Sequence, residues 1–290
     1  MRAADANAGA LPGGDERPVW LLLHELDDAS AEPLRRALGP VAEAAGGMLL
    51  SVPAPALLQA RGWSLRMDSQ GATQSTLQLG PHRIASHRLR AVLNRLGPVQ
   101  VPGAEADAAY LQQEWQAVLA FWLASLPCPV LNAAHPTGLS GPQASPSWWR
   151  LQAAQAGLAT RADAGGAGVT GLARTRLLVL GDRCLPAPES GPSARQDLTL
   201  QPWLDALPAF ARQLGVALLE VWLTRERGGP WVFDHADPRP LLRALDAPVH
   251  EALLDCLALR APQPARPASQ AAADRPTFPL HTAPARECHP

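Results

Sequence analysis

The segment Val19–Leu38, VWLLLHELDDASAEPLRRAL, contains the change of pattern that decides the fold. Its first residues, Val19–Leu23, are all apolar, as is typical of a strand buried on both faces. An acidic turn follows and ends at Ser30, a good helix-capping residue, after which leucines recur four residues apart. Because Pro33 fits a helix only in its first turn, the sequence predicts a helix that begins near Ser30.

The residues that follow extend this pattern into an α/β layer. Met48–Val52 is a second apolar run, so the chain opens as strand–helix–strand. Trp63–Met67 and Ser75–Leu79 alternate apolar and polar side chains around a Ser-Gln-Gly turn, which predicts a hairpin with one buried face. Arg90–Asn94 is a further short strand. Together these segments predict an α/β domain over residues 18–100.

A second region is expected over residues 101–260. It opens with the clearest helix of the chain, Asp107–Leu126, whose apolar side chains fall on one stripe. Further helices are predicted at Trp148–Ala156, Pro202–Leu214, Leu241–Leu245 and Val249–Leu259. Strands are predicted at Arg176–Leu180, Val216–Leu223 and Trp231–Phe233.

Composition excludes several classes of protein. The net charge of -1 argues against electrostatic capture of nucleic acid or of an anionic membrane. Val19–Leu23 is too short for a membrane span or a signal-peptide core. The 4 cysteines are too widely spaced for a disulfide framework or a zinc site, so a cytoplasmic protein is expected.

Three stretches, taken in order, resemble the ATP-grasp ligases that modify ribosomal peptides. Val19–Leu38, with LGPHRIASHRLRAVLNRLG at 79–97, resembles their pre-ATP-grasp domain, which ends in an arginine at the place of Arg95. EWQAVLAFWLASLPCPVLNAAHPTGLSGPQASPSWWRLQAAQAGL at 114–158 resembles a long helix, an asparagine at Asn132, and a helix ending in Gly-Leu. RLLVLGD at 176–182 and LGVALLEVWLTRERGGPWVFDHADPRP at 214–240 resemble the C-terminal lobe of the grasp.

The resemblance implies a fold and a set of site residues. The fold is α/β, with a pre-ATP-grasp-like domain followed by a truncated ATP-grasp-like α+β region. Arg176 is the implied catalytic residue, and the implied nucleotide-binding residues are Arg95, Asn132 and Arg176. Glu220, Asp234 and Asp237 supply the carboxylates that Mg²⁺ prefers. Without the family resemblance, Arg176 would be a surface arginine on an edge strand. The three acids would then belong to a solvated strand end and an Asp-Pro turn.

Departures from the family bear directly on activity. All 25 basic residues are arginine, so the lysines that hold the nucleotide phosphates in the family are missing. Only 17 residues separate Leu158 from Arg176, too few for the β-rich lobe that covers the nucleotide. His235 and Asp237 stand where the family has an acid and an asparagine. Arginine can replace lysine as a phosphate partner, but it cannot replace a missing lobe.

We therefore expect a degenerate ATP-grasp-like protein that acts as a non-catalytic binding or accessory partner in a peptide or amino-acid ligase pathway. Its partner would be a peptide substrate or an intact ligase. The alternative is an active ATP-dependent carboxylate–amine (or carboxylate–thiol) ligase that uses ATP and Mg²⁺, with arginines in place of lysines.

Other patterns are weaker. Gly166–Gly171 spells GxGxxG but precedes a strand, which is the wrong context for a dinucleotide site. The cysteines and histidines show no hydrolase spacing. Trp148 and Trp149 are expected in the core more than in a binding anchor.

The two ends of the chain are expected to be disordered, as a leader over residues 1–17 and a Pro/Ala-rich tail over 261–290. Truncation after Arg260 is accordingly expected to move the melting temperature by no more than about 2 °C. The alternative is that Phe278 and Leu280 dock into the cleft left open by the missing lobe.

Overall fold

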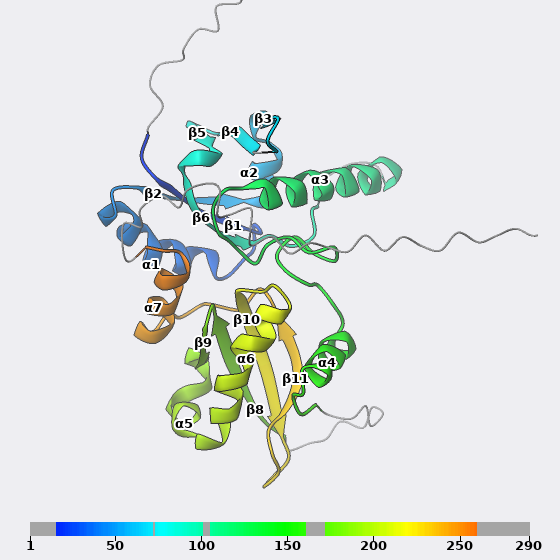
Figure 1. Cartoon of the computed structure of the whole chain (residues 1–290). Helices are drawn as coiled ribbons and strands as arrows, with labels where there is room; N and C mark the ends of the chain where they lie inside the picture. The colour runs from blue at the N-terminus through cyan, green and yellow to red at the C-terminus, as the bar shows by residue number, and fades with distance from the viewer. Residues whose placement is uncertain (1–15, 72, 101–104, 161–171, 260–290) are drawn as a thin grey trace, which may run out of the picture.

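The computed structural model describes residues 16–71, 73–100, 105–160 and 172–259. Most of the expected leader, the GxGxxG segment and the tail lie outside the described residues. The described chain forms two parts, each built on a four-stranded sheet, one above the other in Figure 1. Within the described part, none of the helices combines the length and the hydrophobicity that a membrane span requires.

The first sheet is parallel and has β1 (Val19–His24) near its centre. β1 pairs with β2 (Met48–Pro53) and β6 (Leu89–Arg95), and the short β7 (Val130–Leu131) extends the sheet beyond β6. All residues of β1 are buried. Helix α1 (Ala31–Ala44) covers one face of the sheet, and apolar residues of α2 (Ala54–Leu58) and α3 (Glu105–Ser125) lie on the other. The predicted strand–helix–strand opening is confirmed.

A small antiparallel sheet packs against the first one. It consists of β3 (Arg61–Met67), β4 (Thr73–Leu79) and β5 (His82–Ala85), and the long helix α3 (Glu105–Ser125) lies across it. The hairpin was predicted to have one buried face: β4 buries its apolar side chains, whereas in β3 only Trp63 packs against the core, beside Trp115 and Trp122. Leu65 and Met67 of β3 stay exposed.

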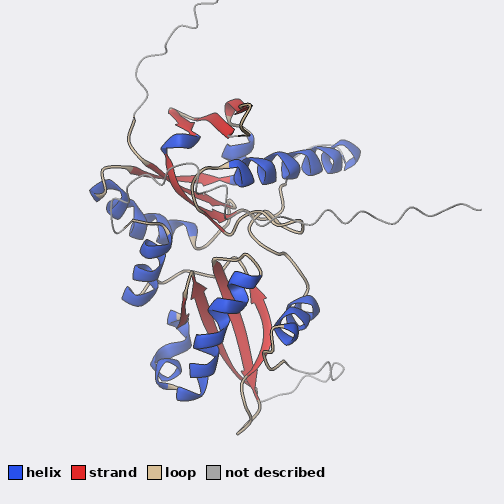
Figure 2. Cartoon of the chain, viewed as in Figure 1, coloured by secondary structure: helices blue, strands red, loops and turns tan. Residues whose placement is uncertain are grey.

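The second sheet is antiparallel and is ordered β11-β10-β8-β9. Its strands are β8 (Ala173–Leu180), β9 (Arg183–Pro186), β10 (Leu218–Arg225) and β11 (Val232–Asp237). Helix α6 (Gln201–Gln213) covers one face, as Figure 2 shows, and α4 (Pro146–Gln155) packs beside β11. The remaining helices are α5 (Gly191–Gln196) and α7 (Ala247–Cys256).

The two parts share a core. Leu178, Leu180 and Leu218 of the second sheet pack in one cluster with α7 and with Leu34 and Leu38 of α1. Figure 1 shows this return of the chain, with α7 beside α1 although some 200 residues separate them in sequence. The second sheet is therefore joined to the first through apolar contacts.

The helix predicted at Leu241–Leu245 is wrong, because this segment is neither helix nor strand. Its backbone N–H groups are used elsewhere: that of Leu241 donates to Glu220 Oε2 (3.1 Å) and that of Leu242 donates to Ser30 Oγ (2.9 Å). Side chains distant in sequence thus set the conformation of this segment.

Candidate functional site

One face of the second sheet carries the sequence-predicted polar residues. Alternate residues of β8 and β10, such as Leu177 and Val221, point towards α6 and form the core on that side. The residues between them point to the opposite face, among them Arg176, Glu220 and Trp222. Arg176 stands opposite Trp222 in the strand register. The site is thus built on regular strands and not on a loop.

Arg176 is held between two carboxylates. Its Nη2 donates to Glu189 Oε2 (2.6 Å), and its Nε lies 3.0 Å from Glu220 Oε1. The guanidinium carbon also lies 5.2 Å from the centroid of the Trp222 ring, which adds a cation–π contact. With a side chain only 15 % exposed, Arg176 is both neutralised and largely shielded from water.

Glu220 is the most buried acid of this face, with an exposed fraction of 3 %. One oxygen, Oε2, accepts the Leu241 N–H. The other, Oε1, is close enough to Arg176 for an ion pair but accepts no hydrogen bond from any described residue. Burial raises the pKa of Glu220, and the nearby Asp237 adds to the rise, although the Leu241 N–H and Arg176 partly oppose it.

The predicted metal ligands are only partly brought together. Glu220 and Asp237 are register partners on neighbouring strands, whereas Asp234 lies at an irregularity of β11 and contacts His235 Nδ1 (3.2 Å). The His235 ring stacks on Trp222, with 5.3 Å between centroids. Among the described residues, no three His, Cys, Asp or Glu side chains converge to hold a metal ion. The metal role of the three acids stays a prediction.

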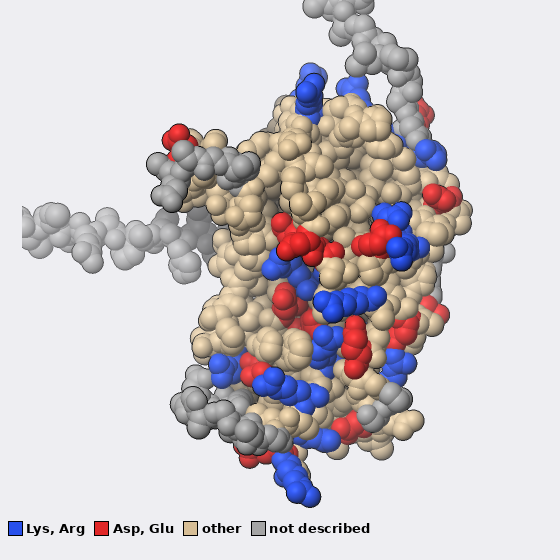
Figure 3. All heavy atoms as spheres, turned by 180° about the vertical axis from the view of Figure 1, so that it is seen from behind, with Lys and Arg blue, Asp and Glu red and all other residues tan. Residues whose placement is uncertain are grey.

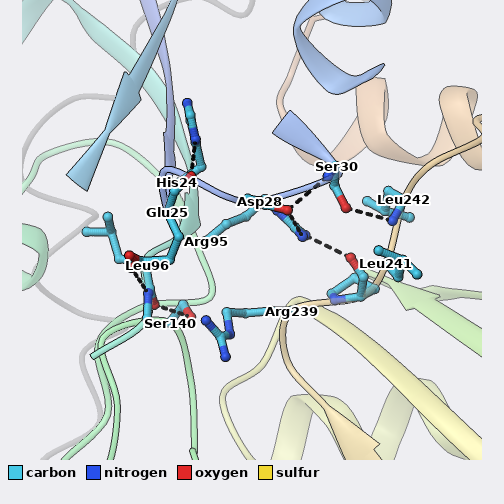
Figure 4. A network of polar contacts seen from close by, with 12 residues as sticks. His24, Glu25, Asp28, Ser30, Arg95, Leu96, Ser140, Arg239, Leu241 and Leu242 are labelled. Atoms are coloured by element: carbon cyan, nitrogen blue, oxygen red, sulfur yellow. Dashed lines mark hydrogen bonds and ion pairs between the residues drawn. The ribbon is translucent and has the colours of Figure 1, made fainter. Parts of the chain in front are cut away.

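Arg95 is the last residue of β6 and lies near the end of β1 (Figure 4). It donates from Nε to Asp28 Oδ2 (2.6 Å), from Nη2 to Asp28 Oδ1 (3.1 Å), and from Nη1 to the Pro240 carbonyl (2.9 Å). Burial by itself would raise the pKa of Asp28, but the hydrogen bonds and charge of Arg95 outweigh it and lower that pKa. A nucleotide-binding role for Arg95 stays a prediction, since its N–H groups already donate to Asp28 and to the Pro240 carbonyl.

Asn132 also serves the contact between the two parts. Its side-chain amide donates to the carbonyls of Leu218 and Pro238, and its Oδ1 accepts the N–H groups of Ala217 and Leu218. Its φ of 60° lies in the left-handed region that asparagine tolerates better than most residues. All of these groups are main-chain atoms of the second part, so a role of Asn132 in nucleotide binding also stays a prediction.

Sequence reasoning missed Glu25 and Arg239, which join the same network (Figure 4). Glu25 Oε1 accepts the Gly97 N–H. A Cβ at Gly97 would lie 2.7 Å from Arg239 Nη1 and 3.1 Å from Glu25 Oε1, so glycine is what allows these side chains to approach. No local pattern marks the two residues, because Glu25 and Arg239 are more than 200 positions apart in the sequence.

Burial disfavours the thiolate form of the described cysteines. Burial raises the pKa of Cys128 and of Cys184 to about 12 and that of Cys256 to about 11, so their thiols stay protonated near neutral pH.

The tryptophan pair is part of the core, as predicted: Trp149 is buried, and Trp148 packs edge-on against it, with 5.1 Å between the ring centroids.

Charge is mixed on the face of the molecule that Figure 3 shows. Figure 3 shows the molecule from behind, and arginine and acidic side chains touch one another in small groups across it. On the described part of this view neither sign forms a broad patch of its own. Such a surface has no strong preference for an anionic ligand.

Solved structures resemble this chain, although no protein-family model and no curated protein matches its sequence. The macrocyclase MdnC from Microcystis aeruginosa MRC, solved with its precursor peptide MdnA, aligns with a TM-score of 0.59 at 11% identity. That alignment covers 84% of this chain and 100% of MdnC. The macrocyclase MdnB from the same organism aligns with a TM-score of 0.54 at 18% identity, over 82% of this chain and 98% of MdnB.

A third structure is a Chryseobacterium gregarium ATP-grasp ligase associated with ribosomally made, modified peptides, solved with ADP and with a leader and core peptide. It aligns with a TM-score of 0.58 at 10% identity, over 84% of this chain and 98% of the ligase. At such identities the likeness concerns the fold alone. It confirms the fold class expected from the sequence.

Proposed function

Because this chain has the fold of the ATP-grasp ligases that modify ribosomal peptides, we propose that it is a non-catalytic, peptide-binding partner in such a pathway. The observation that carries the proposal is the state of Arg176. This arginine, which resembles the phosphate ligand of active members, already pairs with Glu189 and Glu220. A phosphate would have to displace two carboxylates to reach it.

ATP and Mg²⁺ do not fit the residues that are present. Phosphoryl transfer needs cations and magnesium clamped on the triphosphate, because charge stabilisation supplies most of the rate. Here the central cation is neutralised, and the described acids do not converge as a metal site. Between Thr160 and Leu172 the chain has only 11 residues in which to build a covering lobe.

Two neighbours in fold support a peptide as the partner. MdnC was solved with a precursor peptide, and the Chryseobacterium gregarium ligase with a leader and core peptide. Peptide binding and phosphoryl transfer use different chemistry, so a chain can lose the second and keep the first. The proposal is that this chain keeps the peptide and has lost the nucleotide.

Calorimetry with ATP and Mg²⁺ tests the loss of the nucleotide. We expect no saturable binding up to millimolar ATP and no ADP release. A sharper version compares Glu189→Ala, which frees one side of Arg176, with Glu189→Ala/Arg176→Ala. ATP binding that appears in the single variant and vanishes in the double one would show that the ion pairs are what exclude phosphate. Micromolar binding with turnover by the parent chain would overturn the proposal.

The peptide partner is tested through the neighbouring genes. We expect one to encode a small precursor peptide or a full-length ligase, and its purified product to bind this chain in calorimetry. If neither product binds, the partner role is wrong, whatever the result with ATP.

A second candidate function, an ATP-dependent carboxylate–amine (or thiol) ligase, is favoured by one observation. Glu220 and Asp237 face each other across neighbouring strands, with Arg176 alongside. In that case Arg176→Ala and Asp237→Ala each abolish ADP release. If both variants match the parent protein, these two residues have no such role.

A further inference from the structure

The small sheet of β3, β4 and β5 has an outer face that the core does not use. Its inner face carries Leu77, Leu79 and Ile84, which are buried against the first sheet and α3. Side chains alternate between the two faces of a strand, so the residues between these three point outwards. Figure 1 shows the small sheet on the outside of the first part, with the first sheet and α3 beneath it.

The strand register brings three arginines together on this outer face. Gln78 of β4 is the register partner of both Arg61 of β3 and Arg83 of β5, so it lies between them. Arg66, farther along β3, is opposite Gln74. Cross-strand partners share a face, so the three arginines point outwards, and all three are exposed. We call the three arginines, together with Gln74, Thr76 and Gln78 of β4, the arginine face.

No carboxylate offsets these charges within the described chain. The three arginines take part in none of its ion pairs. The segment from Arg61 to Arg95 contains six arginines, and its only acid is Asp68, in the turn after β3, where Oδ1 accepts the Gln70 N–H (2.9 Å). Opposite charges on neighbouring strands stabilise a sheet, but here neutral side chains stand between like charges. The stability of the sheet therefore does not account for this arrangement.

The net charge of -1 for the whole chain conceals this local excess of positive charge. Helix α3, which packs on the inner side of the small sheet, contains three acids and no basic residue. Charge is thus separated within the first part. Unpaired surface charges act on ions in solution over roughly 10 Å at 0.1 M salt. The arginine face is therefore suited to an anionic partner.

The chemistry of the face favours the carboxylates of a polypeptide. A guanidinium binds carboxylate and phosphate with the same fork of N–H groups, so the arginines alone do not distinguish them. Proteins that hold single-stranded nucleic acid on a sheet stack its bases on aromatic side chains, and the arginine face has none. Its glutamine and threonine side chains offer both donors and acceptors, which match the N–H and C=O groups of a peptide backbone.

We propose that the arginine face binds an acidic segment of a partner polypeptide, whose carboxylates pair with Arg61, Arg66 and Arg83. The proposal rests on the partner role proposed above only in taking a polypeptide as the occupant. Arg61 and Arg83 lie two strand spacings apart, which is roughly 10 Å. In an extended polyproline-type conformation every third side chain lies on the same side, about 9 Å from the last. Acids three residues apart therefore reach both arginines.

Fluorescence anisotropy on the full-length chain tests the proposal with a labelled synthetic peptide of about twelve residues that has aspartate at every third position. We expect saturable binding with a Kd on the order of 10 µM at about 50 mM salt, weakening as salt is added. The triple variant Arg61→Gln/Arg66→Gln/Arg83→Gln should bind roughly tenfold more weakly or worse, because each lost guanidinium removes a charge-assisted contact. If the parent chain shows no saturable binding, the proposal is wrong.

The matched control is Arg174→Gln/Arg227→Gln/Arg243→Gln, which removes the same charge from three exposed arginines elsewhere. This control should bind the peptide as the parent chain does, and equal weakening would mean that only net charge matters, which overturns the proposal. A single-stranded oligonucleotide of matching charge is measured beside the peptide. If the oligonucleotide binds more tightly and through the same arginines, the occupant is nucleic acid and the proposal is also wrong.

The same variants separate this proposal from the partner role. If a precursor peptide or ligase encoded nearby binds the parent chain and the arginine-face triple variant equally well, the partner role stands and the arginine face is not its site. If the synthetic peptide binds as expected but neither gene product binds, the arginine face stands and the partner role fails.

Discussion

Arg95 and Asp28 form an ion pair within the first part, at the point where Arg95 also reaches the Pro240 carbonyl of the second. Both are nearly buried, with side chains 4% and 11% exposed, and the carboxylate takes two N–H groups of one guanidinium. Removing one partner of a buried pair leaves the other charge without compensation, which costs more than the pair itself contributes. The Pro240 carbonyl is held by the same guanidinium, so this cost is felt across the interface.

We predict that Asp28→Asn destabilises the protein at pH 7 by about 3 kcal/mol. The pKa of Asp28 is lowered from 3.8, so its contribution is fully present above pH 3.8 and is lost as the pH falls towards the lower, folded-state pKa. Urea unfolding of parent and variant, measured as a pH series, should therefore converge in acid. Glu32→Gln, which breaks an exposed ion pair, should have a smaller effect at every pH. A difference independent of pH would contradict this assignment.

Glu220 has the opposite sign of pH dependence. Its pKa is raised from 4.5 by burial, so ionisation of Glu220 opposes folding. The protein is therefore most stable, as far as Glu220 is concerned, below pH 4.5, and it loses this stability as the pH rises through the folded-state pKa. We predict that Glu220→Gln gains stability relative to the parent protein as the pH rises through this range. The same urea series measures it. The difference in free energy of unfolding between variant and parent should change with pH in opposite directions for Glu220→Gln and Asp28→Asn. If it changes in the same direction, the environment of one of the two acids is wrongly described.

At the scale of elements, Asn132 connects the end of β7 to the start of β10. It satisfies main-chain donors and acceptors that would otherwise be buried without partners, because Asn132 and Leu218 are both inaccessible to water. An unmet buried donor or acceptor costs about 1–3 kcal/mol. One side chain thus fixes how the second sheet approaches the first.

We predict that Asn132→Ala costs about 2–4 kcal/mol of stability, since four hydrogen bonds are lost. Asn132→Gly loses the same bonds but accepts a φ of 60° without strain, so it should be less destabilising by on the order of 1 kcal/mol. Thermal melts of the two variants separate the bonds from the backbone strain. If Asn132→Ala were as stable as the parent protein, the four hydrogen bonds would contribute little to the free energy of unfolding.

On the scale of the whole molecule, the two parts share one apolar cluster. It contains Leu34 and Leu38 of α1 together with Leu178 of β8 and Leu253 of α7. Neither part can unfold alone without exposing apolar surface of the other, which costs roughly 25 cal/mol per Å². Arg95 and Asn132 add hydrogen bonds between the two parts.

We predict a single cooperative unfolding transition, with calorimetric and van't Hoff enthalpies agreeing to a ratio of about 1. Leu253→Ala, which opens a cavity in the shared cluster, should lower the melting temperature of the whole transition and not split it. Leu198→Ala, at an exposed position, is the control and should leave the transition in place. Two separate transitions in the parent protein would show that the parts fold independently.

Local pattern was sufficient to predict most elements. β1, α1 and β2 follow from an apolar run, a capped helix signal and a second apolar run, because each pattern is complete within about twenty residues. α4 begins after Ser145, whose side chain accepts the Trp148 N–H, and such a cap is readable in the sequence. The order of the family-like segments predicted the fold class.

Only the tertiary structure decided what the polar residues touch. Arg95 meets Pro240 across 145 positions, and Asn132 meets Leu218 across 86. The acids that neutralise Arg176 come from a neighbouring strand and from a turn after β9, and nothing in the local sequence relates them. The same holds for β3, whose alternation predicts a buried face although Leu65 and Met67 are exposed and only Trp63 packs against the core. Periodicity is a property of neighbours along the chain, whereas charge pairing and burial depend on neighbours in space.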